Sequence, residues 1–578
     1  MSEIRIVSMS QQAHVTEAQG TGLTSGAELI AQVQHSRLDP AWFGARALVV
    51  GLGESGLAMA TWLSKCGAQV TVLDSREEPP QKTHLQQILP QTRFVHAAFA
   101  EFKCEGFDLV AWSPGLSIEV GESAVLFNTA KAQGLEVLGE LDLFLSALAS
   151  QADSGYRPKL IGITGTNGKT TVTALAAHLC KAAGVLAQAA GNIGPSMLEA
   201  WMQTGERLPQ VWVLELSSFQ IALAHLKAEQ KIFDAATVLN LSQDHLDWHQ
   251  SMASYRDAKV KLLTATKVQV VGDDAALMYK EIVPEVLKPG RLSAKATQAA
   301  AVDKPAEGSV AAMLTPALSA PVKQPLVSSI ARFLSGTPAS IGDFGLVQEG
   351  SLTWLAAGTP GEQIPTRRKG VQTELIITRL MPADALKIRG QHNHLNVLAA
   401  LALCRAIALP LSALLHGLRD YCGEAHRCEL ISIIDDVEYI DDSKGTNVGA
   451  TAAGLLGLGK PCHLILGGEG KGQDFAPLID PVKRFSKTLL MIGRDARLIA
   501  ATLEPSGVDT IFCVSLEDAV AQGAARAKTG EAVLLSPACA SFDMFKSYVH
   551  RGQVFKGLVN KLAQDRGQLV GLHSEGDA

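Results

Sequence analysis

The sequence predicts an α/β protein of three units in series, and three observations support that prediction. From Arg46 onward, short runs of β-branched and aliphatic residues alternate with longer amphipathic stretches, as in parallel sheets covered by helices. Two glycine-rich loops each follow such a run and precede a helical pattern. The chain has 578 residues, more than one hydrophobic core usually organises, so several domains are expected.

Four apolar runs predict the strands of a first unit, assigned to 46–149: ALVV, QVTVLD, FDLVAWSP and LEVLG. Residues 1–45 are assigned to an N-terminal extension without a known role. A polar connector, SQADSGYRPK, follows the fourth run and precedes KLIGIT, the first strand of the next unit. The first domain boundary is therefore expected near residue 150.

A second unit is assigned to 150–423, with strands that include KLIGIT, VWVLELS and AATVLNLS. Between about 288 and 371 the composition shifts to Ala, Pro, Ser, Thr and Gly, which predicts a flexible low-complexity insertion that carries no chemistry. Regular structure is expected to resume near Leu375 and to lead into a long helix in GQHNHLNVLAALALCRA. A third unit, 424–578, is predicted from strands at ISIID, CHLILGG, TLLMIG, TIFCV and AVLLSP.

The charge and the cysteines limit the class of protein. A formal net charge of -6 and a pI near 6.2 give no basic surface for phosphates, so no nucleic-acid partner is expected. The nine cysteines form no CxxC pair, which favours reduced thiols in a cytoplasmic protein. The N-terminus lacks a signal-peptide pattern, and no apolar run reaches the ~20 residues of a membrane span.

The segment GITGTNGKTT predicts a phosphate-binding loop, because it follows an apolar strand and precedes the helical pattern VTALAAHLC. It is a variant of the Walker pattern, with Ile163 where that pattern has glycine. Lys169 would reach the β and γ phosphates, and the Thr170 hydroxyl would join a Mg²⁺ shell. The alternative is a glycine-rich turn with a solvated lysine.

Candidate metal ligands follow two later strands. Glu215 lies among apolar strand residues, so its carboxylate needs a metal ion or a paired cation. The loop NLSQDHLDWH contains Asp244, His245, Asp247 and His249, any of which could equally be a surface residue. Lys259, in YRDAKVKLL, would ordinarily be a solvated helix lysine.

Taken together, the motifs resemble those of a known family. GTNGKTT, GNIG, LELSSFQ, NLSQDHLDWH, the lysine of DAK, GQHNHLN, EAHR, DDSKGTN and GGEGKG occur in this order between Arg46 and about Phe555. The chain resembles the Mur ligases, the ATP-dependent amide-forming enzymes of peptidoglycan precursor synthesis. This resemblance implies a three-domain α/β architecture: a Rossmann-like N-terminal domain, a P-loop ATPase central domain and a Rossmann-like C-terminal domain.

The resemblance also implies the chemistry. A substrate carboxylate receives the γ phosphate of ATP and becomes an acyl phosphate, and an amine then displaces the phosphate. Lysine, arginine and two Mg²⁺ ions would stabilise the charge on the phosphate and carboxylate oxygens.

Family positions assign roles to residues of this chain. Lys169, His245, Lys259 and Lys444 are implied to be catalytic, and the implied metal ligands are Thr170, Glu215, His245 and Lys259, the last as a carbamylated lysine. The implied ATP contacts are Gly165, Thr166, Asn167, Gly168, Lys169, Thr170, Thr171, Asn393, Asn396, Arg427 and Asp442.

The first unit contains a second glycine-rich loop, VVGLGESGLAMATWL, with Gly51, Gly53 and Gly56 between a strand and a helix. Asp74 ends the next strand, at the spacing of a dinucleotide fingerprint, so the loop by itself favours a nicotinamide cofactor. A uridine diphosphate sugar needs the same close approach of the backbone to a pyrophosphate. Both readings remain open at this point.

The loop GLGESG and the stretch Ser113, Pro114, Gly115 are similar to those of the D-glutamate-adding branch of the family, although Glu54 stands where an aliphatic residue is common. The branch implies that UDP-N-acetylmuramoyl-L-alanine contacts Gly53, Ser55, Ser75, Arg76, Asn192 and Ser217. The segment SPACASFDMFKSYVHRG resembles its amino-acid site, and D-glutamate is implied to contact Thr446, Lys471, Ser541, Phe542 and Tyr548.

The expected function is therefore ATP-dependent addition of D-glutamate to UDP-N-acetylmuramoyl-L-alanine by a cytoplasmic monomer. Rival readings are another Mur ligase, a folate polyglutamate synthase, a nicotinamide-dependent oxidoreductase and a non-catalytic nucleotide-binding module.

Overall fold

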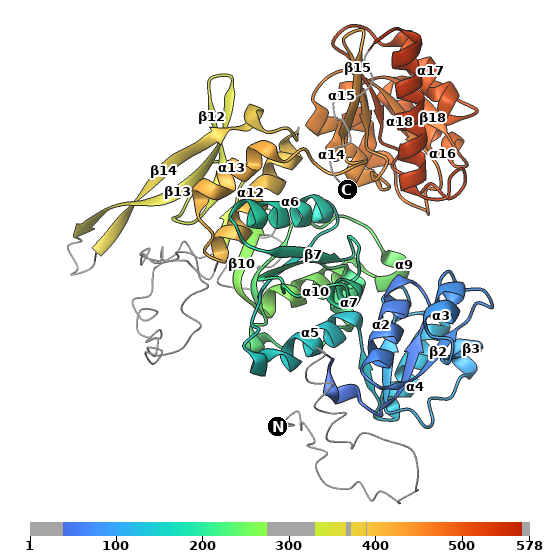
Figure 1. Ribbon diagram of the computed structural model, residues 1–578. Helices are drawn as coiled ribbons and strands as arrows, with labels where there is room; N and C mark the ends of the chain where they lie inside the picture. The colour runs from blue at the N-terminus through green and yellow to red at the C-terminus, as the bar shows by residue number, and fades with distance from the viewer. Residues whose placement is uncertain (1–37, 274–329, 366–370, 389, 569–578) are drawn as a thin grey trace, which may run out of the picture.

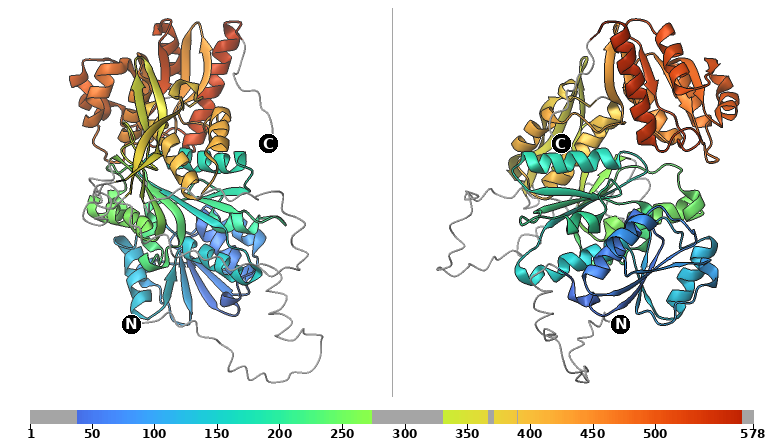
Figure 2. Two further views of the ribbon diagram at one scale, coloured as in Figure 1. Left: turned by 90° about the vertical axis from the view of Figure 1, so that its left-hand side faces the viewer. Right: turned by 45° about the vertical axis from the view of Figure 1, so that its right-hand side comes forward.

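The computed structural model describes residues 38–273, 330–365, 371–388 and 390–568. The chain forms three sheets, one after another along the sequence, as the colours of Figure 1 show. The third sheet, in orange and red, lies at the opposite end of the molecule from the first, in blue, in both views of Figure 2.

The first sheet is fully parallel with the strand order β3-β2-β1-β4-β5. Its strands are β1 (Arg46–Val50), β2 (Gln69–Asp74), β3 (Arg93–His96), β4 (Leu109–Trp112) and β5 (Glu136–Leu138). Its helices are α2 (Glu54–Lys65), α3 (Lys82–Ile88), α4 (Gly121–Ala132) and α5 (Glu140–Ser150). The four strands expected from the sequence are present. The fifth, β3, was not predicted because its four residues include no fully buried side chain.

The second sheet has nine strands in the order β14-β13-β12-β11-β10-β9-β6-β8-β7. The strand β6 (Lys159–Thr164) is paired on both sides, with β8 (Val211–Glu215) and β9 (Phe233–Val238). It is therefore an interior strand of the sheet, and its carboxyl end is flanked by those of β8 and β9. The other parallel strands are β7 (Ala187–Gly191), β10 (Thr266–Gly272), β11 (Ile330–Phe333) and β12 (Phe344–Glu349).

Helices cover both faces of this sheet. They are α6 (Lys169–Ala182), α7 (Met197–Met202), α8 (Ser218–Leu223), α9 (Leu246–His249), α10 (Met252–Thr264), α12 (Gln391–Ala406) and α13 (Leu411–Asp420). The helix α12 packs against α6, so the predicted long Ala/Leu-rich helix covers the phosphate-loop helix.

A flexible insertion was predicted for 288–371, and this prediction is wrong for 330–365, which forms β-strands. The strands β11 and β12 are followed by β13 (Leu352–Pro365) and β14 (Val371–Pro382), which pair antiparallel and extend away from the sheet (Figure 1). Leu355, Ala356 and Ala357 are buried, so this segment contributes to the hydrophobic core although its composition is typical of a flexible insertion. The rest of the predicted insertion, 288–329 and 366–370, lies outside the described residues.

The third sheet has the order β15-β16-β20-β17-β18-β19, parallel except for the β15–β16 pair. Its strands are β15 (Glu429–Ile434), β16 (Val437–Asp441), β17 (Cys462–Gly467), β18 (Ser486–Ile492), β19 (Asp509–Phe512) and β20 (Ala532–Leu535). Its helices are α14 (Val448–Leu458), α15 (Ile479–Phe485), α16 (Ala496–Leu503), α17 (Leu516–Arg526) and α18 (Tyr548–Asp565).

One hydrophobic core joins the first and second units. It runs from Val49 and Trp62 beside the first sheet to Trp212 and Phe233 of the second. Phe144, on α5 between the two sheets, meets Trp212 edge-on with ring centroids 5.0 Å apart. The third unit has separate cores on the two faces of its own sheet. The first two units are therefore packed as one body, and the third is joined to it by fewer contacts. Among the described helices, none is both long enough and apolar enough to cross a membrane.

Candidate active site

The phosphate loop lies at the carboxyl end of β6, directly before α6. Gly168 takes a left-handed φ of 83°, and a Cβ there would lie 2.6 Å from the side-chain oxygen of Asn396. Asn396 lies on α12, where its amide donates to Asn393 at 3.1 Å. The loop is therefore pressed against the amino-terminal turn of α12, which brings the two predicted asparagines to the predicted phosphate site.

Lys169 folds back over this loop. Its ammonium donates to the carbonyl oxygens of Gly165 and Thr166, each at 2.8 Å. Burial lowers the pKa of Lys169, and the nearby Glu215 opposes that shift. The lysine thus holds a cation at the centre of the loop, where a phosphate oxygen would bind.

Side chains after β9 hold the loop from the other side. The backbone N–H of Asn167 donates to the side chain of Asn240 at 2.8 Å, and the amide of Asn240 returns a bond to the Asn167 carbonyl at 3.0 Å. The Thr166 hydroxyl lies 3.1 Å from the hydroxyl of Tyr255, on α10. Thr166 and Asn167 are therefore fixed by neighbours in the second unit.

The third unit reaches the same loop. The Arg427 guanidinium donates to the Thr170 hydroxyl, and the Asn447 amide donates to the Asn167 side chain at 3.2 Å. Both donors come from segments that flank β15 and β16. The structure thus brings the predicted arginine to the predicted metal-binding threonine, across the boundary between the second and third units.

Asp442 and Lys444 follow β16 and lie beside Arg427. Burial raises the pKa of Asp442 to about 7, although the Ser536 hydroxyl donates to it at 2.7 Å. Burial, then Arg427, lowers the pKa of Lys444 to about 8. The Lys444 ammonium lies 3.8 Å from the ring centroid of Tyr548. The structure therefore groups Lys444 with Tyr548, the predicted amino-acid contact.

Glu215 ends β8 and is 1% exposed. One carboxylate oxygen accepts a bond from the Asn192 amide at 2.8 Å, and the other is buried without a hydrogen-bond partner among the described residues. Ser217 follows two residues later and caps α8 through the N–H of Gln220. A buried oxygen left without a donor fits a Mg²⁺ ligand, and Asn192 and Ser217 lie next to it.

Lys259 is 2% exposed, on the buried face of α10. Its amine donates to the Gly165 carbonyl at 2.9 Å and lies 4.5 Å from the Tyr255 ring centroid. Burial and the neighbouring Lys169 hold its pKa well below the usual lysine value. The reading of Lys259 as an ordinary solvated lysine is therefore wrong.

The two histidines after β9 differ in their surroundings. His245 has a left-handed φ of 56°, lies against Phe219, and has its pKa lowered by burial. His249 is fully buried, lies 2.9 Å from the Ser218 hydroxyl, and has a pKa lowered to about 4 by burial. Both imidazoles are therefore neutral near pH 7, and His245 is the one with solvent access.

In the first unit, the carboxylate of Asp74 is saturated by protein donors. It accepts from the backbone N–H of Leu52 at 2.8 Å and from the Arg76 backbone and guanidinium at 2.8–2.9 Å. Asp74 is 1% exposed, so it does not present an oxygen to a ribose. That geometry weighs against the nicotinamide reading of the loop.

The remaining predicted precursor contacts lie near this loop. Gly53 is the N-cap residue of α2, and Ser55 lies in its first turn. Ser75 and Arg76 are exposed after β2. Glu54 is also exposed, so its side chain leaves the turn open to a ligand.

The predicted amino-acid contacts gather after the strands of the third sheet. A bridge between Glu469 and Ala540 brings the GGEGKG and SPACAS segments together. The Lys471 ammonium lies 6.0 Å from the Phe542 ring centroid, and Phe542 is 67% exposed. Ser541 is buried, and the Thr446 N–H bonds to the Lys444 carbonyl at 2.8 Å.

Sequence reasoning missed one residue that supports this part of the site. Arg551, on α18, is 1% exposed and donates to the carbonyl oxygens of Ser443 at 2.8 Å and of Cys539 at 3.2 Å. Burial lowers its pKa to about 10. It ties the Lys444 segment to the Ser541 segment. An arginine on the apolar face of a helical pattern was the available signal.

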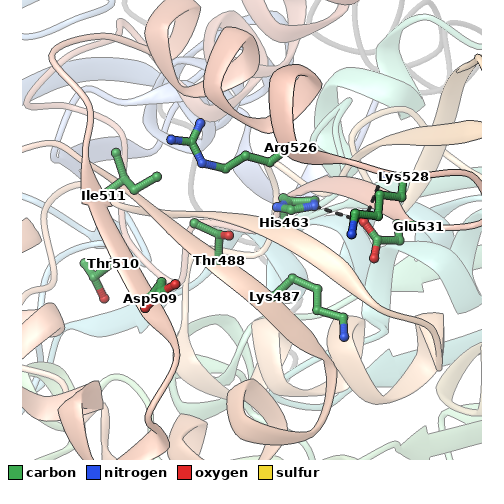
Figure 3. A pocket seen from close by; sticks show the side chains of 9 residues that line it. All are labelled: His463, Lys487, Thr488, Asp509, Thr510, Ile511, Arg526, Lys528 and Glu531. Carbon is green, nitrogen blue, oxygen red and sulfur yellow. Dashed lines mark hydrogen bonds and ion pairs between the residues drawn. The ribbon is translucent and has the colours of Figure 1, made fainter.

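A surface hollow of about 550 Å³ lies elsewhere in the third unit, between the amino ends of β18 and β19 and the end of α17 (Figure 3). It is lined by His463, Lys487, Thr488, Asp509, Thr510, Ile511, Arg526, Lys528 and Glu531. No residue predicted for ATP, metal or substrate lines it, so this hollow is separate from the candidate active site.

Three family models match the chain. They are a MurD-like N-terminal domain of Mur ligases over 45–139, the Mur ligase middle domain over 163–328, and the glutamate ligase domain of Mur ligases over 426–539.

Curated relatives match nearly the whole chain. The UDP-N-acetylmuramoylalanine–D-glutamate ligase of Ralstonia nicotianae is 46% identical over 536 residues, which cover 90% of this chain and 98% of the relative. The enzyme of the same name from Paraburkholderia xenovorans is 44% identical and is covered to 97% by a match to 90% of this chain. A crystal structure of UDP-N-acetylmuramate-alanine ligase MurC from Thermotoga maritima aligns with a TM-score of 0.49 and 16% identity, covering 90% of this chain and all of that one.

The chain therefore belongs to the Mur ligase family. Within the family, it groups with the UDP-N-acetylmuramoylalanine–D-glutamate ligases.

Proposed function

We propose that the protein adds D-glutamate to UDP-N-acetylmuramoyl-L-alanine at the expense of ATP, in peptidoglycan precursor synthesis. The observation that carries this proposal is the meeting of three segments at one place. The phosphate loop with Lys169, the Glu215–Asn192 pair and the Arg427–Lys444 segment come from two units and converge on Thr170 and Glu215. A carboxylate and a terminal phosphate held there would face several cations.

The chain's own residues account for the activation step. The carboxylate of the precursor attacks the γ phosphorus and the bond to the β-phosphate oxygen breaks, which gives an acyl phosphate and ADP. Lys169 and Arg427 lie where they would neutralise the charge that grows on the phosphate oxygens. The amine of D-glutamate then attacks the acyl carbon, inorganic phosphate leaves, and the amine proton passes to solvent or a nearby base.

Mg²⁺ is proposed as the cofactor, with two ions. The buried, unpartnered oxygen of Glu215 and the hydroxyl of Thr170 fit one ion, and the neutral imidazole of His245 fits the second. When bound, the ions would offset phosphate charge and hold the reacting oxygens in place.

Lys259 is proposed to be carbamylated. Burial and the neighbouring Lys169 lower its pKa, which favours the neutral amine, the form that reacts with carbon dioxide. The nitrogen forms a bond to the carbon of CO₂ and releases a proton, which converts a potential cation into an anionic oxygen ligand. The resulting anion would attract Lys169, which disfavours a protonated Lys259.

D-Glutamate is proposed to bind after the strands of the third sheet, through Thr446, Lys471, Ser541, Phe542 and Tyr548. Lys471 and Lys444 provide cations for a dicarboxylate, and Phe542 and Tyr548 lie beside them. A cytoplasmic monomer is proposed as the active form. All nine cysteines are free, as suits a reducing compartment.

The test is phosphate release from ATP with UDP-N-acetylmuramoyl-L-alanine as the acceptor. We expect release only when D-glutamate is also present, and we expect ¹⁸O in the precursor carboxylate to appear in the phosphate. Equal release with L-glutamate or L-lysine, or no ¹⁸O transfer, would refute the proposed reaction.

A further inference from the structure

The helix α14 of the third unit lies at the boundary with the second unit, and Figure 1 shows it on the side of the third unit that faces the phosphate-loop helix. Its N-cap residue, Asn447, donates to the Asn167 side chain at 3.2 Å. A Cβ on Gly449, in its first turn, would lie 3.3 Å from the Asn167 amide nitrogen and 3.3 Å from the Ser242 hydroxyl. The amino end of α14 therefore touches the phosphate loop.

The carboxyl end of α14 meets the start of α12 through two glycines and one ring. A Cβ on Gly457 would lie 2.3 Å from the Nδ1 atom of His392 and 3.4 Å from the Cα of Gly390. A Cβ on Gly390 would lie 2.8 Å from the Cα of Gly457 and 2.9 Å from the Cε1 atom of His392. Non-bonded carbons favour separations of about 3.5–4 Å, so a larger residue at either position would collide. The His392 ring is enclosed by one glycine from each unit.

The backbone of α14 does not itself require glycine at position 457. The helix ends at Gly459, which has a left-handed φ of 64°, whereas Gly457 does not have a left-handed φ. Glycine lowers the stability of a helix relative to alanine, so Gly457 is unfavourable for α14 on its own. What it provides is space for His392. The Nδ1 atom of this ring is buried without a hydrogen-bond partner among the described residues, so the contact depends on shape.

This contact is linked to the phosphate loop through α12. His392 and Asn396 are four residues apart, so they lie on the same face of this helix. Asn396 is the residue that presses on Gly168 of the phosphate loop. The same face of α12 therefore meets the third unit at its first turn and the phosphate loop at the next. The third unit also provides Arg427, which donates to the Thr170 hydroxyl.

We propose that Gly457 and His392 are positioning residues that set where the third unit stops when the site closes. Closure ends when the backbone of α14 meets the His392 ring, and in that position Arg427 and Lys444 lie at the phosphate loop. A side chain at position 457 would hold the third unit further away. This inference rests on the proposed function and adds two residues that touch no substrate themselves.

The test compares Gly457→Ala with Gly557→Ala, a matched change in α18 where a Cβ would meet nothing within 4 Å. Both variants replace a helix glycine, so both should keep or raise the melting temperature. We expect only Gly457→Ala to lower kcat/KM for ATP, by about tenfold or more, because the added methyl group opposes closure. Unchanged kcat/KM in Gly457→Ala, or an equal loss in Gly557→Ala, would overturn the proposal.

A second comparison isolates the collision with the ring. In a His392→Ala protein the atoms within 3 Å of the new methyl group are gone, and the next atom is the Gly390 Cα at 3.4 Å. We therefore expect Gly457→Ala to change kcat/KM for ATP by less than about twofold in that background. Losses that multiply in the double variant would show that the methyl group acts elsewhere, and would overturn the proposal.

Hydrogen exchange separates this inference from the proposed function. With a non-hydrolysable ATP analogue bound, we expect amides of 390–396 and 448–458 to exchange faster in Gly457→Ala than in Gly557→Ala. Equal exchange in the two variants would refute the contact between the units. Wild-type protein that does not turn over the precursor would refute the proposed function, while the exchange comparison would still decide whether Gly457 seats the third unit.

Discussion

Three lysines of the candidate active site share one property at the residue scale: each has a lowered pKa. Burial is the main cause for Lys169, Lys259 and Lys444, and mutual repulsion adds to it for Lys259. Folding thus brings three lysines together where burial destabilises their charged form as long as no anionic ligand is bound. A bound triphosphate and a bound carboxylate would stabilise the charged lysines. Part of the binding free energy would therefore come from these three side chains, which folding has already positioned.

Lys444 gives a pH-dependence that can be measured. Its folded-state pKa is lowered to about 8, so the free enzyme loses this positive charge as the pH rises through that value. We expect kcat/KM for ATP, which reports the free enzyme, to fall above pH 8. Lys444→Arg should remove this fall because arginine stays charged. An equally steep fall in the arginine variant would show that another group is titrating.

We expect Lys259 to be essential for ligase activity and the nearby Lys261 not to be. We expect Lys259→Ala to lower ligase activity at least about 100-fold, since a metal-binding group is lost. Lys261→Ala, two residues further along α10, is the control, because Lys261 contacts only the Ala222 carbonyl at 3.2 Å among its described bonds. Initial rates of phosphate release measure both. Near-normal turnover in Lys259→Ala would contradict the carbamate proposal.

At the scale of elements, the sequence predicts best where local signals and tertiary structure agree. The phosphate loop was identifiable because its glycines, lysine and flanking strand and helix are contiguous. The strands between 330 and 365 were not, because Ala, Gly, Thr and Pro are frequent in and between them and their burial depends on distant partners. Arg551 was missed for the same reason. Its partner, the Ser443 carbonyl, is 108 residues away, and no spacing rule connects the two.

In the turn between β6 and α6, adding a methyl group at Gly168 is expected to lower both stability and nucleotide affinity. Gly168→Ala would force an alanine to φ 83° and place its Cβ 2.6 Å from Asn396. Gly184→Ala is the control, with φ 78° and open space around its Cβ. We expect both to lose about 1–2 kcal/mol of unfolding free energy from backbone strain. Only Gly168→Ala should also lose nucleotide affinity, as measured by titration with ADP. Equal ADP affinity in the two variants would show that the Asn396 contact does not matter for binding.

At the scale of the whole molecule, the hydrophobic cores divide the chain in two rather than three. The first and second units share a core, whereas the third has its own. Contacts such as Arg427 with Thr170 and Asn447 with Asn167 are polar and cross this boundary. Closure of the site is therefore expected to be a motion of the third unit against a rigid pair.

Hydrogen exchange can test this division. We expect Phe144→Ala to cost about 3–5 kcal/mol and to speed amide exchange in both of the first two sheets together. Phe555→Ala, which removes an equally buried ring from the third unit, should speed exchange in that unit alone. Faster exchange confined to the first sheet in Phe144→Ala would show that the two units open independently.

The shared core also bears on the design of inhibitors. A compound that bridges the sugar-nucleotide site and the ATP site would span a distance that the shared hydrophobic core of the first two units keeps constant. A stiff linker of one length should therefore fit both the open and the closed enzyme. A compound extended into the proposed glutamate site would instead need a flexible linker, because the third unit is expected to move relative to the other two.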